Sequence, residues 1–379
     1  MGVMLTTPAL AAAGGALALV GALAIALPAS AAPTPVATVW PTAAGANPAH
    51  ITSGPDGNLW FTEDGTNSIG RVTTAGVITD FPVPTAASHP DGITSGPDGN
   101  LWFSEGNADQ IGRITPAGVI TEFPLTAGSG PEGIVSAPDG NLWLAEEGGD
   151  KIAVIDTTGT VVHEYAVATV GDEPDEIVVG SDGNLWYTNF GAASIGTTDI
   201  TTGAATDYPI GIAVSGSRFL ALGSDGNVWF TTSSFSANGN ITPTGTVSIL
   251  PGMDVAVTVT NGPDGNLRVA NAATATIDTI TTAGADIAQY GVGAGAFPPS
   301  SLVTGPDGNI WFTVNDNVGV LNLNPPPAAP AAAKPSLAST GAGPWTSWLA
   351  VGGVIAIGLG AILAVWAVVG RARRFNRAD

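Results

Sequence analysis

Short apolar runs alternate with turn residues along most of the chain. In the first complete unit, residues 51–54 and 59–62 are apolar runs on either side of Pro-Asp-Gly-Asn, and residues 69–73 and 77–82 are two further runs. Runs this short, rich in Val, Ile, Thr and aromatic residues and separated by Gly, Asp and Asn, are typical of β-strands joined by tight turns. We therefore expect four antiparallel strands, a to d, in each unit.

The unit repeats along the chain. Its Asp-Gly-Asn core occurs seven times, at spacings of 42, 41, 43, 43, 39 and 43 residues. The copies begin at Asp56, Asp98, Asp139, Asp182, Asp225, Asp264 and Asp307. Four short strands that recur about every forty residues predict the blades of a propeller. The fold class is therefore all-β, a seven-bladed β-propeller of four-stranded antiparallel blades over residues 33–324.

The two ends of the repeat array complement each other. The last unit has runs for strands a to c but reaches Pro325 without a fourth, whereas the isolated run 36–41 resembles a strand d. Because an open sheet edge is a liability, we expect this N-terminal strand to complete the last blade.

A tryptophan occupies one fixed position in six of the seven units, and Arg268 stands there in the sixth. The tryptophans are Trp60, Trp102, Trp143, Trp186, Trp229 and Trp311. Large aromatic side chains at a fixed repeat position form the core between blades, or alternatively a surface on which ligands stack. We expect the core role.

The segment before the repeats has the features of an export signal. An apolar stretch at residues 9–28 precedes Ala-Ser-Ala at 29–31, a small-residue cleavage pattern, so residues 1–32 are predicted to be a signal peptide. A retained membrane anchor is the alternative. The chain has no Cys, which suits export without dependence on disulfides.

The segment after the repeats has four parts. A Pro/Ala-rich linker (325–336) precedes Leu-Ala-Ser-Thr-Gly (337–341), an uncharged stretch long enough for a transmembrane helix (345–370), and a basic cytoplasmic tail (371–379). This order resembles a sortase sorting signal of the actinobacterial type, carried by Leu337, Ala338, Thr340 and Gly341.

The resemblance implies that a sortase cleaves between Thr340 and Gly341 and joins the chain to peptidoglycan. The expected location is the cell wall of a Gram-positive, actinobacterial cell, with membrane contact only through the helix before sorting. A permanent single-pass anchor is the alternative, and in either case we expect a monomer that faces outward.

Charge excludes one class of partner. Thirty of the 31 acidic residues lie between residues 32 and 340, together with only six of the ten basic residues, and 23 of the acidic residues precede Ile210. So negative a surface repels nucleic acid, and we expect an extracellular ligand instead.

The repeat also resembles a known family. Pro-x-Gly-Ile, Gly-Pro-Asp-Gly-Asn-Leu-Trp-Phe-x-Glu, Ile-Gly-Arg-Ile-Thr and Gly-x-Ile-Thr-Glu-Phe-Pro are similar to the blade of the virginiamycin B lyase family, most literally at residues 90–125. The resemblance implies a seven-bladed propeller and a Mg²⁺-assisted elimination that opens a cyclic depsipeptide lactone. It also implies a Glu-Pro-His at the start of one strand a, with the His as base, and metal-binding carboxylates that include the Glu closing the next strand b.

No unit carries this complete set. The nearest is Glu173-Pro174-Asp175, with Asp in place of His, and His50 lies one place beyond the expected position. A hairpin centred between Asp56 and Gly57 would place His50 opposite Glu63. His50 and Glu63 are therefore the candidate catalytic pair, although the incomplete motif does not favour lyase activity on a streptogramin.

A set of carboxylates remains at the predicted mouth of the ring. By the same hairpin rule the ends of strands b share a face with the starts of strands a. Glu63, Glu105 and Glu146 are candidate ligands for Mg²⁺ or Ca²⁺, and Asp91, Glu132, Glu173 and Asp175 form a candidate ligand-binding rim. Acceptance of backbone hydrogen bonds is the alternative role for all of them.

Three functions follow from these residues. The first, which the incomplete motif favours, is a surface binding module. The second is a Mg²⁺-dependent lyase that acts on another cyclic ester, and the third is a lactone hydrolase.

Overall fold

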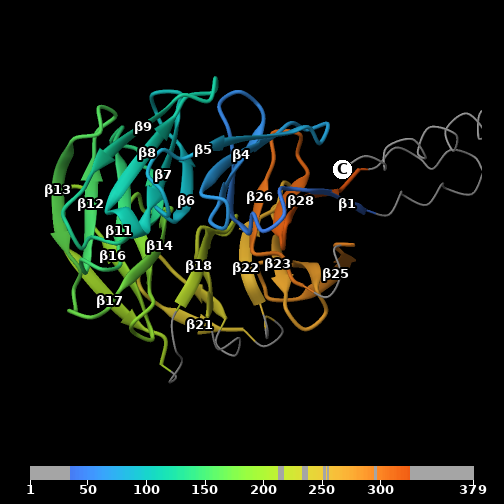
Figure 1. Cartoon of the computed structure of the whole chain (residues 1–379). Coiled ribbons are helices and arrows are strands. Elements are labelled where there is room, and N and C mark those ends of the chain that lie inside the picture. The colour runs from blue at the N-terminus through green and yellow to red at the C-terminus, as the bar shows by residue number, and fades with distance from the viewer. Residues whose placement is uncertain are drawn as a thin grey trace, which may run out of the picture. The chain divides into compact units, whose positions relative to one another are not determined.

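The computed structural model describes residues 35–211, 217–232, 238–250, 253, 256–293 and 297–324. Within these ranges the chain forms seven four-stranded antiparallel sheets, each with its strands in sequential order apart from the last. Figure 1 shows the sheets following one another around a ring, from blue through green and yellow to orange. The predicted seven-bladed propeller is confirmed.

The strands of blades 1 to 4 follow the repeat closely. Blade 1 contains β2 (Pro48–Ser53), β3 (Leu59–Glu63), β4 (Ser68–Val72) and β5 (Ile78–Pro82), and blade 2 contains β6 (Pro90–Ser95), β7 (Leu101–Glu105), β8 (Gln110–Ile114) and β9 (Ile120–Pro124), with the 3₁₀ turn η1 (Gly106–Ala108) between β7 and β8. Blade 3 contains β10 (Pro131–Ser136), β11 (Leu142–Glu146), β12 (Lys151–Ile155) and β13 (Val161–Ala166), and blade 4 contains β14 (Pro174–Val179), β15 (Leu185–Asn189), β16 (Ser194–Thr198) and β17 (Ala205–Pro209).

Blades 5 to 7 complete the ring. Blade 5 contains β18 (Ser217–Leu222), β19 (Val228–Thr232), β20 (Gly239–Ile241) and β21 (Val247–Ile249), and blade 6 contains β22 (Ala256–Asn261), β23 (Leu267–Asn271), β24 (Thr276–Ile280) and β25 (Asp286–Gly291). Blade 7 contains β26 (Ser301–Thr304), β27 (Ile310–Val314) and β28 (Asn317–Asn322), together with β1 (Val36–Pro41).

The ring closes between the first strand and the last. β1 pairs antiparallel with β28 from Val36 opposite Asn322 to Pro41 opposite Asn317, as Figure 1 shows for the blue and orange strands. The Trp40 ring stacks on the Trp311 ring at a centroid distance of 5.6 Å. The carboxylate of Asp316 accepts hydrogen bonds from the backbone N–H groups of Gly45 and Asn47. The predicted closure of the last blade by the N-terminal strand is confirmed.

Six of the seven Asp-Gly-Asn turns hold their own tryptophan in place. In blade 1, Asp56 accepts hydrogen bonds from the backbone N–H of Asn58 at 3.1 Å and from the indole N–H of Trp60 at 3.0 Å. In blade 6 the guanidinium of Arg268 donates to Asp264 at 3.0 Å, so the arginine takes over the hydrogen bond of the missing indole.

The tryptophans form the core between blades. All six are at most 1% exposed. Trp60, for example, belongs to a cluster with Ile93, Leu101 and Phe103 of the next blade. Side chains that solvent does not reach cannot stack on a ligand, so the predicted core role is confirmed.

The predicted signal peptide, linker, sorting motif, membrane-spanning helix and basic tail all lie outside the described residues. Within the described ranges, no helix has the length and apolar character needed to span a membrane.

Candidate functional site

A β-bulge begins strand a in six of the blades. In blade 1, Pro48 lies opposite Glu63 and Ile51 opposite Phe61, so Ala49 and His50 both face Thr62. The same shift occurs after Pro90, Pro131, Pro174, Ser217 and Ala256. A bulge adds a residue to one strand, bends it and re-aims its side chains. Two consecutive residues of each bulged strand a can therefore be placed at the centre of the ring.

The observed register differs from the predicted one in two ways. Ser53 lies opposite Leu59, so the hairpin is centred on Asp56 and not between Asp56 and Gly57, and the bulge then adds a residue to strand a. His50 does not face Glu63, because Pro48 takes that place. Glu105 and Glu146 likewise pair with Pro90 and Pro131. The predicted pairing of His50 with Glu63 was therefore wrong, since it placed the centre of the hairpin half a residue too late and assumed no inserted residue.

The three strand b glutamates are buried rather than exposed at the mouth. Glu63, Glu105 and Glu146 are at most 1% exposed. Burial raises the pKa of each to about 7, and a second acid of the same blade, Asp80, Glu122 or Glu164, adds to the increase. They belong to three separate blades and none of them lines the central cavity. These residues do not fit a shared Mg²⁺ or Ca²⁺ site.

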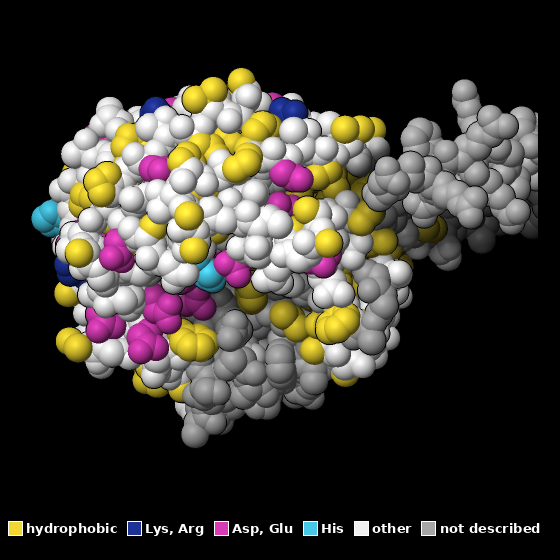
Figure 2. Space-filling model, viewed as in Figure 1, with side chains coloured by type: hydrophobic (Ala, Val, Ile, Leu, Met, Phe, Trp, Pro, Cys, Tyr) yellow, Lys and Arg dark blue, Asp and Glu magenta, His cyan; other side chains and the backbone are white. Residues whose placement is uncertain are grey.

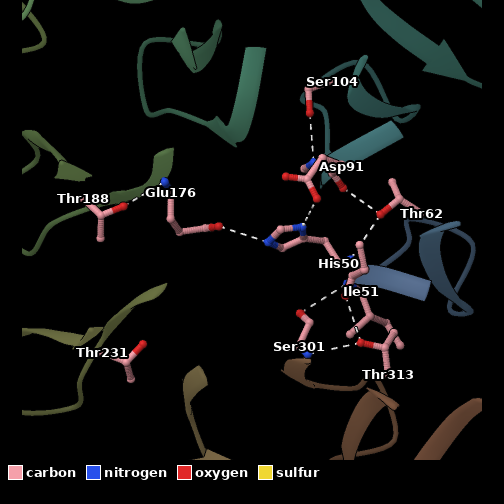
Figure 3. A network of polar contacts seen from close by, with 12 residues as sticks. His50, Ile51, Thr62, Asp91, Ser104, Glu176, Thr188, Thr231, Ser301 and Thr313 are labelled. Atoms are coloured by element: carbon pink, nitrogen blue, oxygen red, sulfur yellow. Dashed lines mark hydrogen bonds and ion pairs between the residues drawn. The ribbon is translucent and has the colours of Figure 1, made fainter. Parts of the chain in front are cut away.

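His50 lies instead between two carboxylates from other blades (Figure 3). Its Nδ1 is 3.0 Å from Oδ1 of Asp91 in blade 2, and its Nε2 is 3.2 Å from Oε2 of Glu176 in blade 4. Its backbone N–H donates to Thr62 Oγ1, and that hydroxyl donates to the Asp91 carbonyl. The histidine thus connects three blades across the ring.

The charges of His50 and Asp91 depend on each other. Burial disfavours the imidazolium of His50, but the charge and hydrogen bond of Asp91, together with those of Glu176, outweigh burial and hold the pKa of His50 well above 6.5. Burial would raise the pKa of Asp91, but its contact with His50 holds that pKa far below its usual value. His50 is therefore a cation at neutral pH, and Asp91 is an anion.

Close packing restricts which blades can contribute side chains at this position. Gly92 and Gly133 occupy in blades 2 and 3 the place that His50 and Glu176 occupy in blades 1 and 4. A Cβ on Gly92 would lie 2.4 Å from the carbonyl oxygen of Glu132, and one on Gly133 would lie 2.5 Å from that of Asp175. The backbones of neighbouring blades are too close for a side chain at Gly92 or Gly133. Because blades 2 and 3 have no side chain at this position, His50 of blade 1 and Glu176 of blade 4 can reach each other.

The mouth of the ring is a small cavity. It has a volume of about 160 Å³ and is lined by Ala49, His50, Asp91, Asp175, Glu176, Phe219 and Ser300. A second cavity of about 110 Å³ shares His50, Glu176 and Phe219 with it. An engineered cavity of about 150 Å³ accepts benzene, so the mouth can take one small group rather than a macrocycle.

The predicted rim residues lie in two neighbouring places. Asp91 and Asp175 line the mouth, whereas Glu132 and Glu173 line an adjacent groove of about 300 Å³. Glu132 connects the two through a side-chain hydrogen bond with Asp91. In the view of Figure 2, acidic side chains gather at the lower left of the molecule.

Two acids of this region hold their protons at neutral pH. Burial, followed by the charges of Glu176 and Asp91, raises the pKa of Asp175 to about 8. Burial, followed by the hydrogen bond with Asp91, raises the pKa of Glu132 to about 11. So many carboxyl groups in one place cannot all ionise unless a cation joins them.

Sequence reasoning missed four residues that line the mouth, Ala49, Glu176, Phe219 and Ser300. A signal for Glu176 was present, because Pro174-Asp-Glu176 aligns with Pro48-Ala-His50 in the repeat. Phe219 belongs to a blade whose sequence matches the repeat poorly, and its ring centroid lies 5.6 Å from that of His50. Among the described residues, no group of three or more Asp, Glu or His side chains is arranged to hold a metal ion.

Comparison with known proteins agrees with the architecture. The model of the virginiamycin B lyase family matches residues 30–210 and 162–344. No curated protein sequence gives a significant match.

Solved structures of the family's enzymes are similar over the whole propeller. A streptogramin B lyase is 30% identical, with a TM-score of 0.71, over 76% of this chain and 98% of its own. Virginiamycin B lyase from Staphylococcus aureus is 29% identical, with a TM-score of 0.70, over 76% of this chain and 99% of its own. A catalytically inactive variant of that enzyme with quinupristin, in which a histidine is replaced by alanine, is 28% identical. The chain belongs to the virginiamycin B lyase family.

Proposed function

We propose that this member of the family is an extracellular binding module whose mouth accepts one positively charged group of a ligand. The observation that carries the proposal is the position of His50 between Asp91 and Glu176. A histidine can act as a base only when one ring nitrogen is free of its proton. His50 keeps both protons because a carboxylate faces each nitrogen, so it is poorly suited to start an elimination.

The remaining groups of the mouth suit a small cation. Asp175 and Glu176 present oxygen atoms in the cavity, and Phe219 adds an aromatic ring, whose face attracts cations. The side chain of the neighbouring Arg218 lies outside the described part of the structure. The cavity volume fits a terminal ammonium or guanidinium group, as in a lysine or arginine side chain or an amino sugar.

Ligand binding should therefore release a proton. Asp175 is largely protonated at pH 7 because its pKa is about 8, and an incoming cation would stabilise its ionised form. We expect n-butylammonium to bind the full-length protein in isothermal titration calorimetry, with a heat that changes with the ionisation enthalpy of the buffer. The isosteric neutral alcohol butan-1-ol should not bind.

A single neutral substitution tests the assignment of the mouth. Asp175→Asn should weaken n-butylammonium binding at least about fivefold, since one charge contact contributes about 1 kcal/mol, and should abolish proton release. Asp98→Asn, in a turn outside the mouth, is the matched control and should bind as the wild type does. Equal binding of amine and alcohol, or no binding by either, would show that the mouth is not a cation site.

Lyase activity is the second candidate, favoured by the family membership and by a histidine in the mouth. The test is incubation with quinupristin and Mg²⁺, followed by liquid chromatography to separate the intact ring from a ring-opened product. We expect no conversion. Conversion that disappears in His50→Ala would establish the lyase and refute the binding module.

We also propose that the propeller is displayed on the cell wall, on the basis of the sequence from Leu337 to Gly341 and the segments on either side. Mass spectrometry of purified cell-wall fragments from a sortase-containing actinobacterial host should find Thr340 as the last residue, joined to a peptidoglycan amine. Thr340→Ala should move the protein to the membrane fraction. Wild-type protein that remains in the membrane fraction would favour the permanent anchor.

A further inference from the structure

In five blades the tryptophan of strand b stacks on an aromatic ring of strand d in the same blade. Trp60 of blade 1, for example, stacks on Phe81 at a centroid distance of 5.5 Å, and blades 2, 3, 4 and 7 repeat this pair. Stacked aromatic rings attract each other beyond the effect of burial alone. The strand d ring of these blades thus has a flat partner.

Blade 6 keeps only one member of the pair. Tyr290 lies opposite Ile277, as Phe81 lies opposite Ile69, so Tyr290 holds the strand d position. Arg268 holds the position of the tryptophan. Among the described residues, no aromatic ring stacks on Tyr290.

The guanidinium of Arg268 replaces only one edge of the indole. A Cβ added to Gly262 would meet Nη1 of Arg268, just as a Cβ added to Gly54 would meet Nε1 of Trp60. Both side chains also donate a hydrogen bond to the Asp of their turn. The guanidinium therefore takes the place of the five-membered ring of the indole. It has no counterpart of the six-membered ring.

The ends of the propeller leave a second gap beside Tyr290. In blade 2, Gly118 of the turn between strands c and d packs so closely on Phe81 of blade 1 that a Cβ there would collide with the ring. Blade 7 has no such turn, because its strands c and d are β28 and β1, from opposite ends of the propeller. Tyr290 therefore lacks the cover that the next blade gives to Phe81.

A cavity of about 370 Å³, which we call the seam slot, adjoins both gaps. It is lined by Pro263, Asp264, Arg268 and Tyr290 of blade 6 and by Pro35, Leu323 and Asn324 of blade 7. Pro263, Asp264 and Asn324 are exposed, so the slot is open to solvent. Arg268 is only 3% exposed, yet its Nε has no hydrogen-bond partner. A buried N–H without a partner is costly, so the wall of the slot contains an unused donor.

We propose that the seam slot binds a planar aromatic group that carries a neutral amide. The ring stacks on Tyr290 in the place of the missing indole. The amide carbonyl accepts a hydrogen bond from Nε of Arg268, and the amide N–H donates to Asp264. Oδ1 of Asp264 accepts one hydrogen bond, from the backbone of Asn266, and an oxygen of this kind can accept two.

Volume and charge favour this class of ligand. An engineered cavity of about 150 Å³ accepts benzene, so the seam slot has room for one ring with a substituent. Asp264 already forms an ion pair with Arg268 at 3.0 Å and would repel an aromatic carboxylate. A neutral amide offers the acceptor and the donor that the two residues require, without a charge.

Benzamide is the probe, and its binding to the full-length protein is measured by saturation-transfer difference NMR. We expect a dissociation constant on the order of 1 mM, which is typical of so small a ligand. Benzoate has the same shape but is an anion, and cyclohexanecarboxamide has the same amide but no flat ring. Each should bind at least about fivefold more weakly than benzamide.

Two substitutions test the residues of the slot. Arg268→Trp restores the repeat and fills the slot with an indole, so it should raise the Tm by about 2 °C or more and abolish benzamide binding. Tyr290→Leu leaves the guanidinium in place and should weaken benzamide binding at least about fivefold. Tyr208→Leu, at the same position of blade 4, is the matched control and should bind benzamide as the wild type does.

The mouth provides an independent control, because it shares no lining residue with the seam slot. Neither Asp175→Asn nor added n-butylammonium should change the binding of benzamide. Binding that persists in Arg268→Trp, or that n-butylammonium abolishes, would place the amide at another site and overturn the proposal. A wild-type protein that does not bind benzamide would also overturn it.

Discussion

Replacing Trp102 by alanine is expected to lower the free energy of unfolding by about 3–5 kcal/mol, the usual cost of removing a buried Trp side chain. Trp102 is fully buried, and its ring stacks on Phe123 at a centroid distance of 5.4 Å. It belongs to a cluster with Leu142 and Leu144 of the next blade, so the cavity would open between blades 2 and 3. Denaturant unfolding followed by tryptophan fluorescence measures the change.

Val119→Ala is the matched control for this substitution. Val119 lies in the same blade but is 62% exposed, so its truncation should change the stability by less than about 0.5 kcal/mol. A loss below about 1 kcal/mol for Trp102→Ala would contradict the role of the tryptophans as the core between blades.

Stability is expected to increase as the pH falls from 8 to 5. The pKa values of Glu63 and Glu146 are raised to about 7 by burial, whereas the unfolded chain has ordinary glutamates with pKa near 4.5. Between these values the unfolded state loses protons that the folded state keeps, so each rise in pH favours unfolding. The stabilisation is complete below about pH 4.5 and is lost by about pH 7, at up to about 3 kcal/mol for each glutamate.

Other groups with raised pKa values act in the same direction, among them Glu105, Glu132, Asp172, Asp175 and His50. The raised pKa of Asp175, about 8, extends the loss of stability into the alkaline range, and His50 is stabilised as a cation until the pH passes its own raised pKa. At the acid end Asp91 acts in the opposite direction, because its pKa is lowered and its protonation breaks the contact with His50. The free energy of unfolding should therefore have its maximum near pH 5.

The measurement is the free energy of unfolding in urea at pH 5, 6, 7 and 8, in EDTA. The double variant Glu63→Gln, Glu146→Gln has no proton to lose at these sites and should show a markedly flatter profile. A wild-type profile that is flat, or that rises with pH, would show that these carboxyl groups are ionised in the folded protein.

Residues in the repeat allowed most of the fold to be predicted. The Asp-Gly-Asn turns, the fixed tryptophan and the isolated run at 36–41 each predicted a local structure that the described residues confirm. These predictions succeeded because turn conformation, strand length and burial depend on neighbouring residues and on a pattern repeated seven times.

The site was harder to predict because it depends on the exact centre of each hairpin and on one inserted residue in strand a. The pairing rule placed His50 opposite Glu63, whereas in the structure His50 meets Asp91 and Glu176 from other blades. The acids Asp91 and Asp175 were identified from the sequence, whereas Glu176, the second carboxylate beside His50, was not. Contacts between residues 126 positions apart, such as His50 and Glu176, have no local sequence signal.

The sequence by itself determined the architecture of this protein: the number of blades, the strand order, the closure of the ring and the acidic character of its first half. Only the tertiary structure decided which acids meet. Ring geometry brings the starts of strands a together at the centre and places the ends of strands b opposite the starts of strands c of the same blades. The physical reason is that a bulge changes where a side chain points without changing which strand it belongs to. The repeat pattern therefore predicts the fold but not the site.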